Sequence, residues 1–185
     1  MMKAKWMKMM AAALAAVSAS LVIAGCGGSA KKEAKKEEGG TLRVAMTATF
    51  PPFEYVDSKT QKFTGIDVDI ANYIAKKLGK KVEVTDMKFA SLIPTLQSGR
   101  ADMVISGISP TAKRSEVVSF TKPYFYPPKA IVAKKGTNFT TLEALKGHKA
   151  GATMGTTYVK ELKSVPGIDV VELDSATMAV QDVLN

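Results

Sequence analysis

A chain of 185 residues, of which 46% are hydrophobic and 23% charged, can bury the core of one domain or of two small ones. Its net charge of +9 does not indicate nucleic-acid binding, because the lysines gather near the N-terminus or scatter without aromatic neighbours. The single cysteine excludes a disulfide within the chain, and the single histidine excludes a metal site built from cysteine and histidine. We therefore expect a folded protein without a metal, a cofactor or a nucleic-acid partner.

Residues 1–26 have the pattern of a secretion signal. Lysines at positions 3, 5 and 8 precede an apolar run that ends in Ile-Ala-Gly-Cys26. Because the run is short of the roughly 20 residues that span a bilayer, we favour a cleaved signal over an uncleaved anchor. The last four residues resemble a bacterial lipobox, which implies that Cys26 is lipidated and holds the protein on a membrane. Residues 27–40 contain no apolar side chain larger than alanine and predict a flexible tether.

The next part of the chain predicts alternating strands and helices. The expected strands are 41–46, 81–85 and 101–105, and the expected helices are 65–79 and 91–97. Prolines at 51 and 52 predict a shaped loop after the first strand. The β-α-β-α-β order implies a parallel sheet, whose ligands bind outside the carboxyl ends of its strands.

The helix expected at 65–79 has a clear apolar side and a charged start. Asp67 and Asp69 are expected to be charges at the positive helix end, and Gly79 is expected to end the helix. The residues expected on its buried face are Ile66, Ile70, Tyr73, Ile74 and Leu78.

Residues 106–114 combine the features of a site for a small carboxylate. Gly107 permits a close backbone approach, Ser109 offers a hydroxyl, and Thr111 can cap a short helix that carries Arg114 in its first turn. An arginine binds carboxylates through two parallel hydrogen bonds, and a helix start adds a favourable potential. From this stretch alone, a surface turn with a solvated arginine is an equally good interpretation.

A second unit follows a stretch rich in tyrosine and proline at 123–128. We expect strands at 130–133, 149–152 and 169–173, and helices at 142–145, after 157 and at 175–185, with Ser175 as a cap. Residues 153–157 form a second loop rich in glycine and hydroxyl groups, and His148 is expected in an exposed turn.

From about residue 41 to residue 185 the chain resembles the bacterial extracellular solute-binding proteins of polar amino acid ABC transporters. The segments that carry the resemblance, in order, are 50–54, 65–69, 98–102, 107–109 with Arg114, 120–124 and 155–157. The resemblance implies an α/β, two-lobed, periplasmic-binding-protein-like (type II) fold, in which each lobe is a mostly parallel sheet covered by helices. Lobe 1 would span 41–126 and lobe 2 would span 127–185, the latter incomplete.

The same resemblance implies a function and a location. The protein would be a lipid-anchored, monomeric and non-enzymatic component on the extracytoplasmic face of the cell membrane. It would bind a polar amino acid, basic ones included, between its lobes and hand it to an ABC transporter permease. Arg114 would bind the α-carboxylate of the ligand, with help from Ser109, Gly107 and, from lobe 2, Thr157.

The remaining implied contacts concern the ligand side chain. Phe50 and Phe89 would sandwich it, unless they are ordinary core aromatics. Ser106 and Thr153 would lie near its end. Some family members that prefer basic ligands carry an acidic residue where Thr47 stands here, which argues against a lysine-type preference, although two aromatic faces still allow a guanidinium or an ammonium group to stack between them.

In the family, the α-ammonium of the ligand binds an aspartate that would lie beyond Asn185. We therefore expect this chain to bind amino acids weakly or not at all, and a version extended by further strands to bind tightly. Two other classes stay open: an enzyme on the same scaffold, such as a dehydratase or a cell-wall-cleaving enzyme, and the ectodomain of a receptor or kinase. The predicted site contains no histidine-based device and no paired carboxylates, which argues against the enzyme.

Overall fold

The computed structural model describes residues 39–185. The predicted signal segment, the lipidation site at Cys26 and the predicted tether up to residue 38 lie outside the described residues. Within 39–185, no helix combines the length and the apolar character that crossing a membrane requires.

A parallel three-stranded sheet organises the first part of the described chain. Its order is β5–β1–β6, formed by Lys81–Asp86, Thr41–Met46 and Met103–Val104. The central strand β1 pairs with β5 along its whole length and is buried over most of it. This burial on both faces explains the apolar run at the end of β1. The predicted parallel β-α-β-α-β unit is confirmed.

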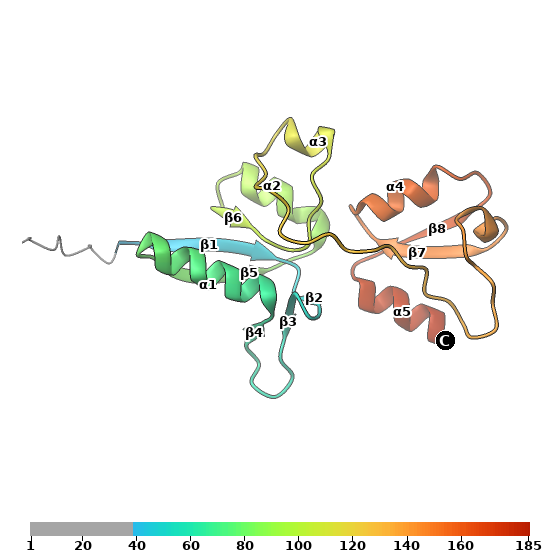
Figure 1. The fold of residues 1–185 in the computed structure, drawn as a ribbon, viewed down its shortest axis with the longest axis horizontal. Helices are drawn as coiled ribbons and strands as arrows, with labels where there is room; N and C mark the ends of the chain where they lie inside the picture. Colours follow the sequence, from blue (N-terminus) through green and yellow to red (C-terminus); the bar gives the residue numbers. More distant parts are fainter. Residues whose placement is uncertain (1–38) are drawn as a thin grey trace, which may run out of the picture. The chain divides into compact units, whose positions relative to one another are not determined.

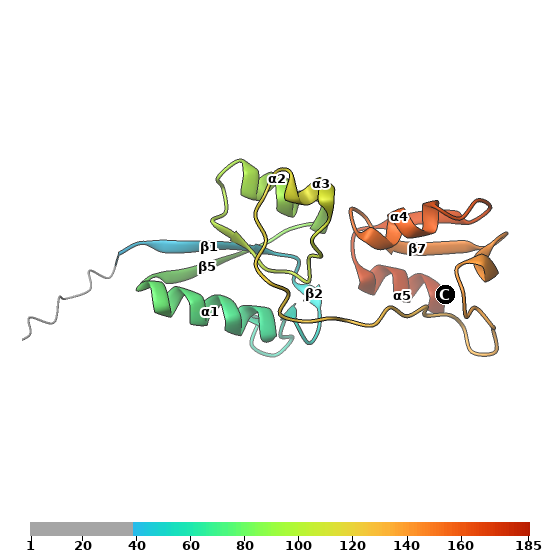
Figure 2. The same ribbon diagram turned by 45° about the horizontal axis from the view of Figure 1, so that its top comes forward.

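Two helices cover this sheet. Helix α1 (Ile66–Leu78) and helix α2 (Leu92–Gln97) lie on opposite faces of it (Figures 1 and 2). A short 3₁₀ turn, η1 (Phe89–Ser91), leads into α2. Leu92 is fully buried and packs with Ala45 of β1 and Ala101, which precedes β6. Gly79 ends α1 with φ of 68°, in the left-handed region, as the sequence predicted.

The buried face of α1 differs from the prediction. The buried residues of this helix are Asp67, Val68, Ala71 and Ala75. Ile70 and Ile74 pack against the core they border, but Ile66, Tyr73 and Leu78 are 45, 62 and 54% exposed. The helix therefore has an apolar side, as predicted, but contacts at its N-terminus determine which residues of that side face the sheet.

Those contacts come from a small antiparallel sheet between β1 and α1. Its strands are β2 (Thr49–Phe50), β3 (Glu54–Val56) and β4 (Phe63–Thr64). Gly65 follows with φ of 119°, and a side chain there would lie 2.2 Å from the carbonyl oxygen of Phe53. The loop 51–53 accepts the first backbone N–H groups of α1, including that of Asp67 on the Phe53 carbonyl at 2.9 Å. This arrangement turns Asp67 into the protein.

The second part of the described chain contains a separate parallel pair, β7 (Lys149–Thr153) with β8 (Asp169–Leu173). Helices α4 (Thr157–Lys163) and α5 (Ala176–Leu184) cover the two faces of this pair (Figures 1 and 2). A 3₁₀ turn, η2 (Glu143–Leu145), precedes β7. The core of this part contains Leu145, Ala152, Val159 and Leu162.

Local predictions in this part are confirmed, with one exception. The Ser175 hydroxyl accepts the N–H of Met178 at 3.2 Å, which makes Ser175 the cap of α5. His148 lies exposed in a bend and contacts the Phe139 ring. The strand predicted at 130–133 does not form, and Ile131 and Val132 are exposed. A β-branched sequence becomes a strand only beside a partner, and no strand within residues 39–185 pairs with this segment.

Candidate functional site

The loop that follows β6 carries Arg114 on a capped helix. Thr111 has extended backbone angles, and its hydroxyl accepts the N–H of Arg114 at 3.2 Å. This hydrogen bond starts the short helix α3 (Ala112–Ser115) and confirms the predicted cap. Gly107 has φ of 53°, and a side chain there would lie 3.9 Å from the Phe50 ring. The loop is therefore a shaped turn that brings Gly107 beside Phe50.

Arg114 is a half-buried cation held by neutral groups. Its Nη1 donates to the Ser109 carbonyl at 2.7 Å, and its Nη2 donates to the Gly155 carbonyl at 2.9 Å. The guanidinium carbon lies 5.6 Å from the centre of the Phe89 ring. Burial lowers the pKa of Arg114, because water is removed from the charged group. Within residues 39–185 no carboxylate pairs with this guanidinium, so the arrangement leaves a partly desolvated cation suited to an external anion.

The two predicted aromatic contacts have different surroundings. Phe89 is partly buried and packs on the core around Leu92, with the Arg114 guanidinium near its ring. Phe50 is 43% exposed and stacks on Phe53 with 5.8 Å between ring centres. Phe50 is therefore not a core residue, whereas Phe89 both fills the core and borders the site.

The second predicted loop, 153–157, meets the first one through Gly155. The Thr156 hydroxyl donates to the Thr153 carbonyl at 2.7 Å, and Thr157 is the first residue of α4. Gly155 has φ of 81°, and a side chain there would lie 3.0 Å from the Cα atom of Ala90. The structure thus brings together Arg114, the segment around Phe89 and this loop.

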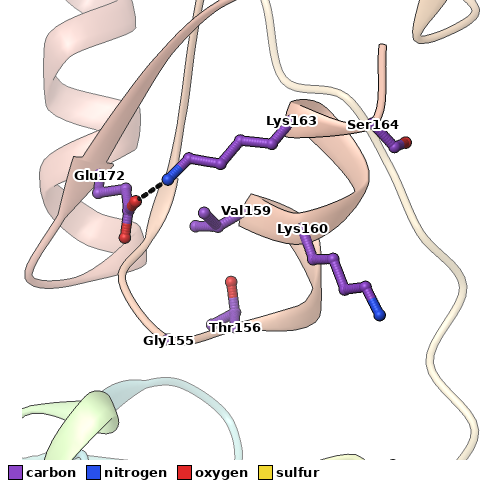
Figure 3. A pocket seen from close by; sticks show the side chains of 7 residues that line it. All are labelled: Gly155, Thr156, Val159, Lys160, Lys163, Ser164 and Glu172. Atoms are coloured by element: carbon purple, nitrogen blue, oxygen red, sulfur yellow. Dashed lines mark hydrogen bonds and ion pairs between the residues drawn. The ribbon is translucent and has the colours of Figure 1, made fainter.

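A hollow opens beside the same loop but carries no predicted site residue. Its lining residues are Gly155, Thr156, Val159, Lys160, Lys163, Ser164 and Glu172 (Figure 3). Lys163 is paired with Glu172 at 2.5 Å across this hollow, and Lys160 extends away from the Lys163–Glu172 pair. The hollow shares only Gly155 with the contacts of Arg114, so the candidate site lies around the arginine.

Thr47 and Ser106, which were predicted to contact the ligand, are almost completely buried. Their exposed fractions are 8 and 3%. The Thr47 hydroxyl donates to the Met87 carbonyl at 2.8 Å, and the Thr47 N–H donates to the Ser106 hydroxyl at 2.9 Å. Ser106 in turn donates its own proton to Glu54 at 2.7 Å. Both hydroxyl protons are engaged within the protein, and ligand contacts of these residues stay predictions.

Glu54 and Asp67 form a buried acidic pair beneath this loop that the sequence analysis missed. They are 1 and 0% exposed. Burial raises the pKa of Glu54 to about 8; the Ser106 hydrogen bond opposes this rise, and the charge of Asp67 and its hydrogen bond add to it. Asp67 lies in the first turn of α1, as predicted, but its side chain is buried there, because the loop 51–53 draws it inward. A signal was present: Glu54 stands between aromatic residues without a neighbouring cation.

Asp67 also connects two other segments. Its Oδ2 atom accepts the Tyr124 hydroxyl at 3.0 Å and the Gly107 N–H at 3.3 Å. Burial, together with the negative charge and hydrogen bond of Asp67, raises the pKa of Tyr124. In the described part of the chain no three histidine, cysteine, aspartate or glutamate side chains gather as a metal site. The pair therefore serves hydrogen bonding between segments.

Comparison with known proteins gives a consistent result. The sequence model of the family described as "Bacterial extracellular solute-binding proteins, family 3" matches residues 42–181. The chain is 32% identical to the arginine-binding extracellular protein ArtP of Bacillus subtilis (strain 168), over 97% of this chain and 68% of that protein. It is 36% identical to ABC transporter arginine-binding protein 1 of Escherichia coli (strain K12), over 78 and 59% of the two chains. It is 37% identical to a probable histidine-binding protein of Neisseria gonorrhoeae, over 81 and 56%.

Comparison with solved structures finds the same kind of protein. An ancestral arginine-binding protein bound to arginine is 45% identical, with a TM-score of 0.75, over 79% of this chain and 66% of that one. The holo form of ArgBP from T. maritima is 39% identical, also with a TM-score of 0.75, over 78 and 65%. The predicted two-lobed α/β fold is confirmed, and the chain spans 56 to 68% of the three curated relatives above. These relatives are named as binding proteins, in agreement with the prediction of a non-enzymatic role.

Proposed function

We propose that this chain, which belongs to the bacterial extracellular solute-binding proteins of family 3, binds a free amino acid through the guanidinium of Arg114. The observation that carries the proposal is the state of that side chain. It is half-buried, oriented by the carbonyls of Ser109 and Gly155, and without a carboxylate partner in residues 39–185. A guanidinium in this state gains more from a carboxylate than a solvated one does, because part of its desolvation cost is already met.

The ligand that fits this site best is arginine. Phe50 offers an exposed ring, and Phe89 already accepts one guanidinium near its face. A cation beside an aromatic ring gains about 0.5–2 kcal/mol. The names of two curated relatives, both arginine-binding proteins, support the same ligand.

Further contacts of the ligand are proposed on both loops. Arg114 takes the α-carboxylate, and Thr47 borders the ligand side chain. The other residues proposed to contact the ligand are Ser106, Gly107, Ser109, Thr153 and Thr157. The lobes that carry these loops are proposed to divide at residues 126 and 127.

The amino acid is proposed to pass to an ABC transporter permease. Support comes from relatives that are named as ABC transporter binding proteins. We also propose that the protein is a monomer held on the extracytoplasmic face of the membrane by a lipid on Cys26, since residues 23–26 resemble a lipobox.

Isothermal titration calorimetry with L-arginine, at protein and ligand concentrations high enough to detect the weak binding expected of this chain, tests the role of Arg114. Arg114→Ala is expected to weaken binding at least about 100-fold, because a buried carboxylate would lose its partner. Arg114→Lys retains the charge but not the fork and is expected to lose about tenfold. Arg100→Lys is the matched control, since Arg100 is an exposed arginine with its own hydrogen bond to Ser98. Equal arginine affinity in the wild type and Arg114→Ala would show that the carboxylate binds elsewhere.

A further inference from the structure

The buried carboxyl groups of Glu54 and Asp67 join segments that are far apart in the sequence. Glu54 follows the loop between β2 and β3, and Asp67 lies in the first turn of α1. Glu54 Oε1 accepts the Ser106 hydroxyl at 2.7 Å, and Asp67 Oδ2 accepts the Gly107 N–H at 3.3 Å. The Ser106–Gly107 turn therefore rests on both acids at once.

The second oxygen of each carboxyl group lacks a protein donor. Glu54 Oε2 and Asp67 Oδ1 are buried, and neither accepts a hydrogen bond from the described residues. Both carboxyl groups lie against adjacent residues, Ser106 and Gly107, and the negative charge of Asp67 contributes to the raised pKa of Glu54. Two buried carboxylate oxygens without donors are costly, whereas one proton between them gives a donor to one and an acceptor to the other.

We propose that Glu54 and Asp67 share one proton and that this protonated pair is a positioning device for the Ser106–Gly107 turn, whose neighbours bind the ligand carboxylate. The pair carries one negative charge, which the hydroxyl of Tyr124 and the N–H of Gly107 stabilise. The effect on ligand affinity rests on the proposed function; the shared proton does not.

The surroundings offer the pair little positive charge. The ion pairs seen in residues 39–185 lie elsewhere. From the crossing segment the titratable group that faces the pair is Tyr124, whose own pKa is raised, so that it stays a neutral donor. On α1 the neighbouring acid, Asp69, is exposed. Loss of the shared proton would therefore leave two negative charges in one buried place.

The structure predicts the sign of the pH effect. The folded chain keeps a proton on Glu54 up to a pH of about 8, whereas the unfolded chain releases it near the ordinary glutamate value. The folded state thus binds more protons between these values, so the free energy of unfolding falls as the pH rises through this window. Ligand binding that needs the protonated pair weakens about tenfold at one pH unit above the pKa, where about one tenth of the molecules retain the proton.

The first experiment needs no ligand and no variant. In the full chain labelled with ¹³C, the carboxyl carbon of Glu54 is followed by NMR as the pH changes. A midpoint at or above about 7 is expected from the shared proton. A midpoint near the ordinary glutamate value would overturn the proposal, whatever the ligand of the protein.

Amide substitutions provide the second test. In Glu54→Gln the new amide N–H replaces the shared proton and donates to Asp67, and in Asp67→Asn it donates to Glu54. Each single variant is expected to stay folded and to lose the fall of stability with pH in urea unfolding. The double variant places two N–H₂ groups face to face and is expected to lose stability or to unfold.

The matched control is the double variant Glu83→Gln with Asp69→Asn, which makes the same changes at exposed positions of β5 and α1. It is expected to behave as the wild type does. If the Glu54→Gln/Asp67→Asn protein is as stable as either single variant, no proton lies between the two groups and the proposal fails.

Calorimetry with L-arginine then tests the positioning role. Between pH 7 and pH 9 the affinity of the wild type for L-arginine is expected to fall about tenfold more than the affinity of Glu54→Gln. The variant serves as the reference because titration of the ligand itself affects both proteins alike. An equal pH dependence in both proteins would overturn the positioning role. Absence of arginine binding at pH 7 would instead contradict the proposed ligand and leave the NMR and unfolding tests of the pair decisive.

Discussion

Gly155 provides a sharp test of the contact between the loop 153–157 and the segment that carries Phe89. Its φ of 81° is in the left-handed region, where an alanine costs about 1–2 kcal/mol. In addition, an added Cβ would lie 3.0 Å from the Cα atom of Ala90 and 3.1 Å from its Cβ. Because one of these atoms belongs to the backbone, the loop has to move, at a further cost of about 1–3 kcal/mol.

Gly147 separates the two costs. Its φ is 80°, but a Cβ there would meet no atom within 4 Å. Gly147→Ala therefore carries the backbone cost alone, and Gly155→Ala carries both. Urea unfolding at 25 °C is expected to show Gly155→Ala about 1–3 kcal/mol less stable than Gly147→Ala.

The same pair of variants reports on ligand binding. The Gly155 carbonyl holds Nη2 of Arg114 at 2.9 Å, so a shift of this loop releases one side of the guanidinium. The affinity for L-arginine in calorimetry is expected to fall about 5- to 150-fold in Gly155→Ala, and to stay within about twofold in Gly147→Ala. Equal stabilities and equal affinities of the two variants would refute the contact with Ala90 as a determinant of the site.

Two further predictions concern the ion pair between Arg43 and Asp102 and the proposed lipidation of Cys26. Asp102 accepts three hydrogen bonds from Arg43, which lower its pKa to about 2. A group whose pKa is lowered in the folded state stabilises the fold at pH values above its ordinary pKa, and this stabilisation is lost as the pH falls toward 2. The difference in the free energy of unfolding between the wild type and Asp102→Asn, measured by urea unfolding, should therefore shrink as the pH falls. A constant difference from pH 5 to pH 2 would contradict this. On expression in bacteria with an alkyne-tagged palmitate, the wild type should carry the label and Cys26→Ser should not; label in both would place the lipid elsewhere.

Predictions that depend on a few neighbouring residues agree with the structure. Gly79 ends its helix in the left-handed region, Thr111 caps α3 and Ser175 caps α5. Each of these features is a hydrogen bond or backbone angle within about four residues, so the sequence pattern contains all of its partners. The parallel strands were predictable for a related reason, since the alternation of strands and helices restricts how they can pack.

Predictions that depend on distant partners were less accurate. The segment 130–133 has the composition of a strand, but strand formation requires a neighbouring strand, which composition does not reveal. The apolar side of α1 was visible, yet the close contact at Gly65 decided which side faces the sheet. Neither the missing strand at 130–133 nor the buried side of α1 can be predicted from the apolar periodicity of these segments alone.

The acidic pair shows why the structure of the proposed ligand-binding loop, residues 106–114, cannot be predicted from the sequence of that loop alone. The sequence predicts that residues 106–114 meet a carboxylate, but it does not reveal that Gly107 and Ser106 rest on acids that are 40 and 52 residues away. Burying two carboxyl groups costs stability, because both lose their contact with water. The pair supplies fixed hydrogen-bond acceptors for the Ser106–Gly107 turn, while the hydrogen bond from Arg114 to the Gly155 carbonyl joins the two loops. In the proposed site, the position of the ligand carboxylate would depend both on Arg114, which would touch it, and on Glu54 and Asp67, which would not.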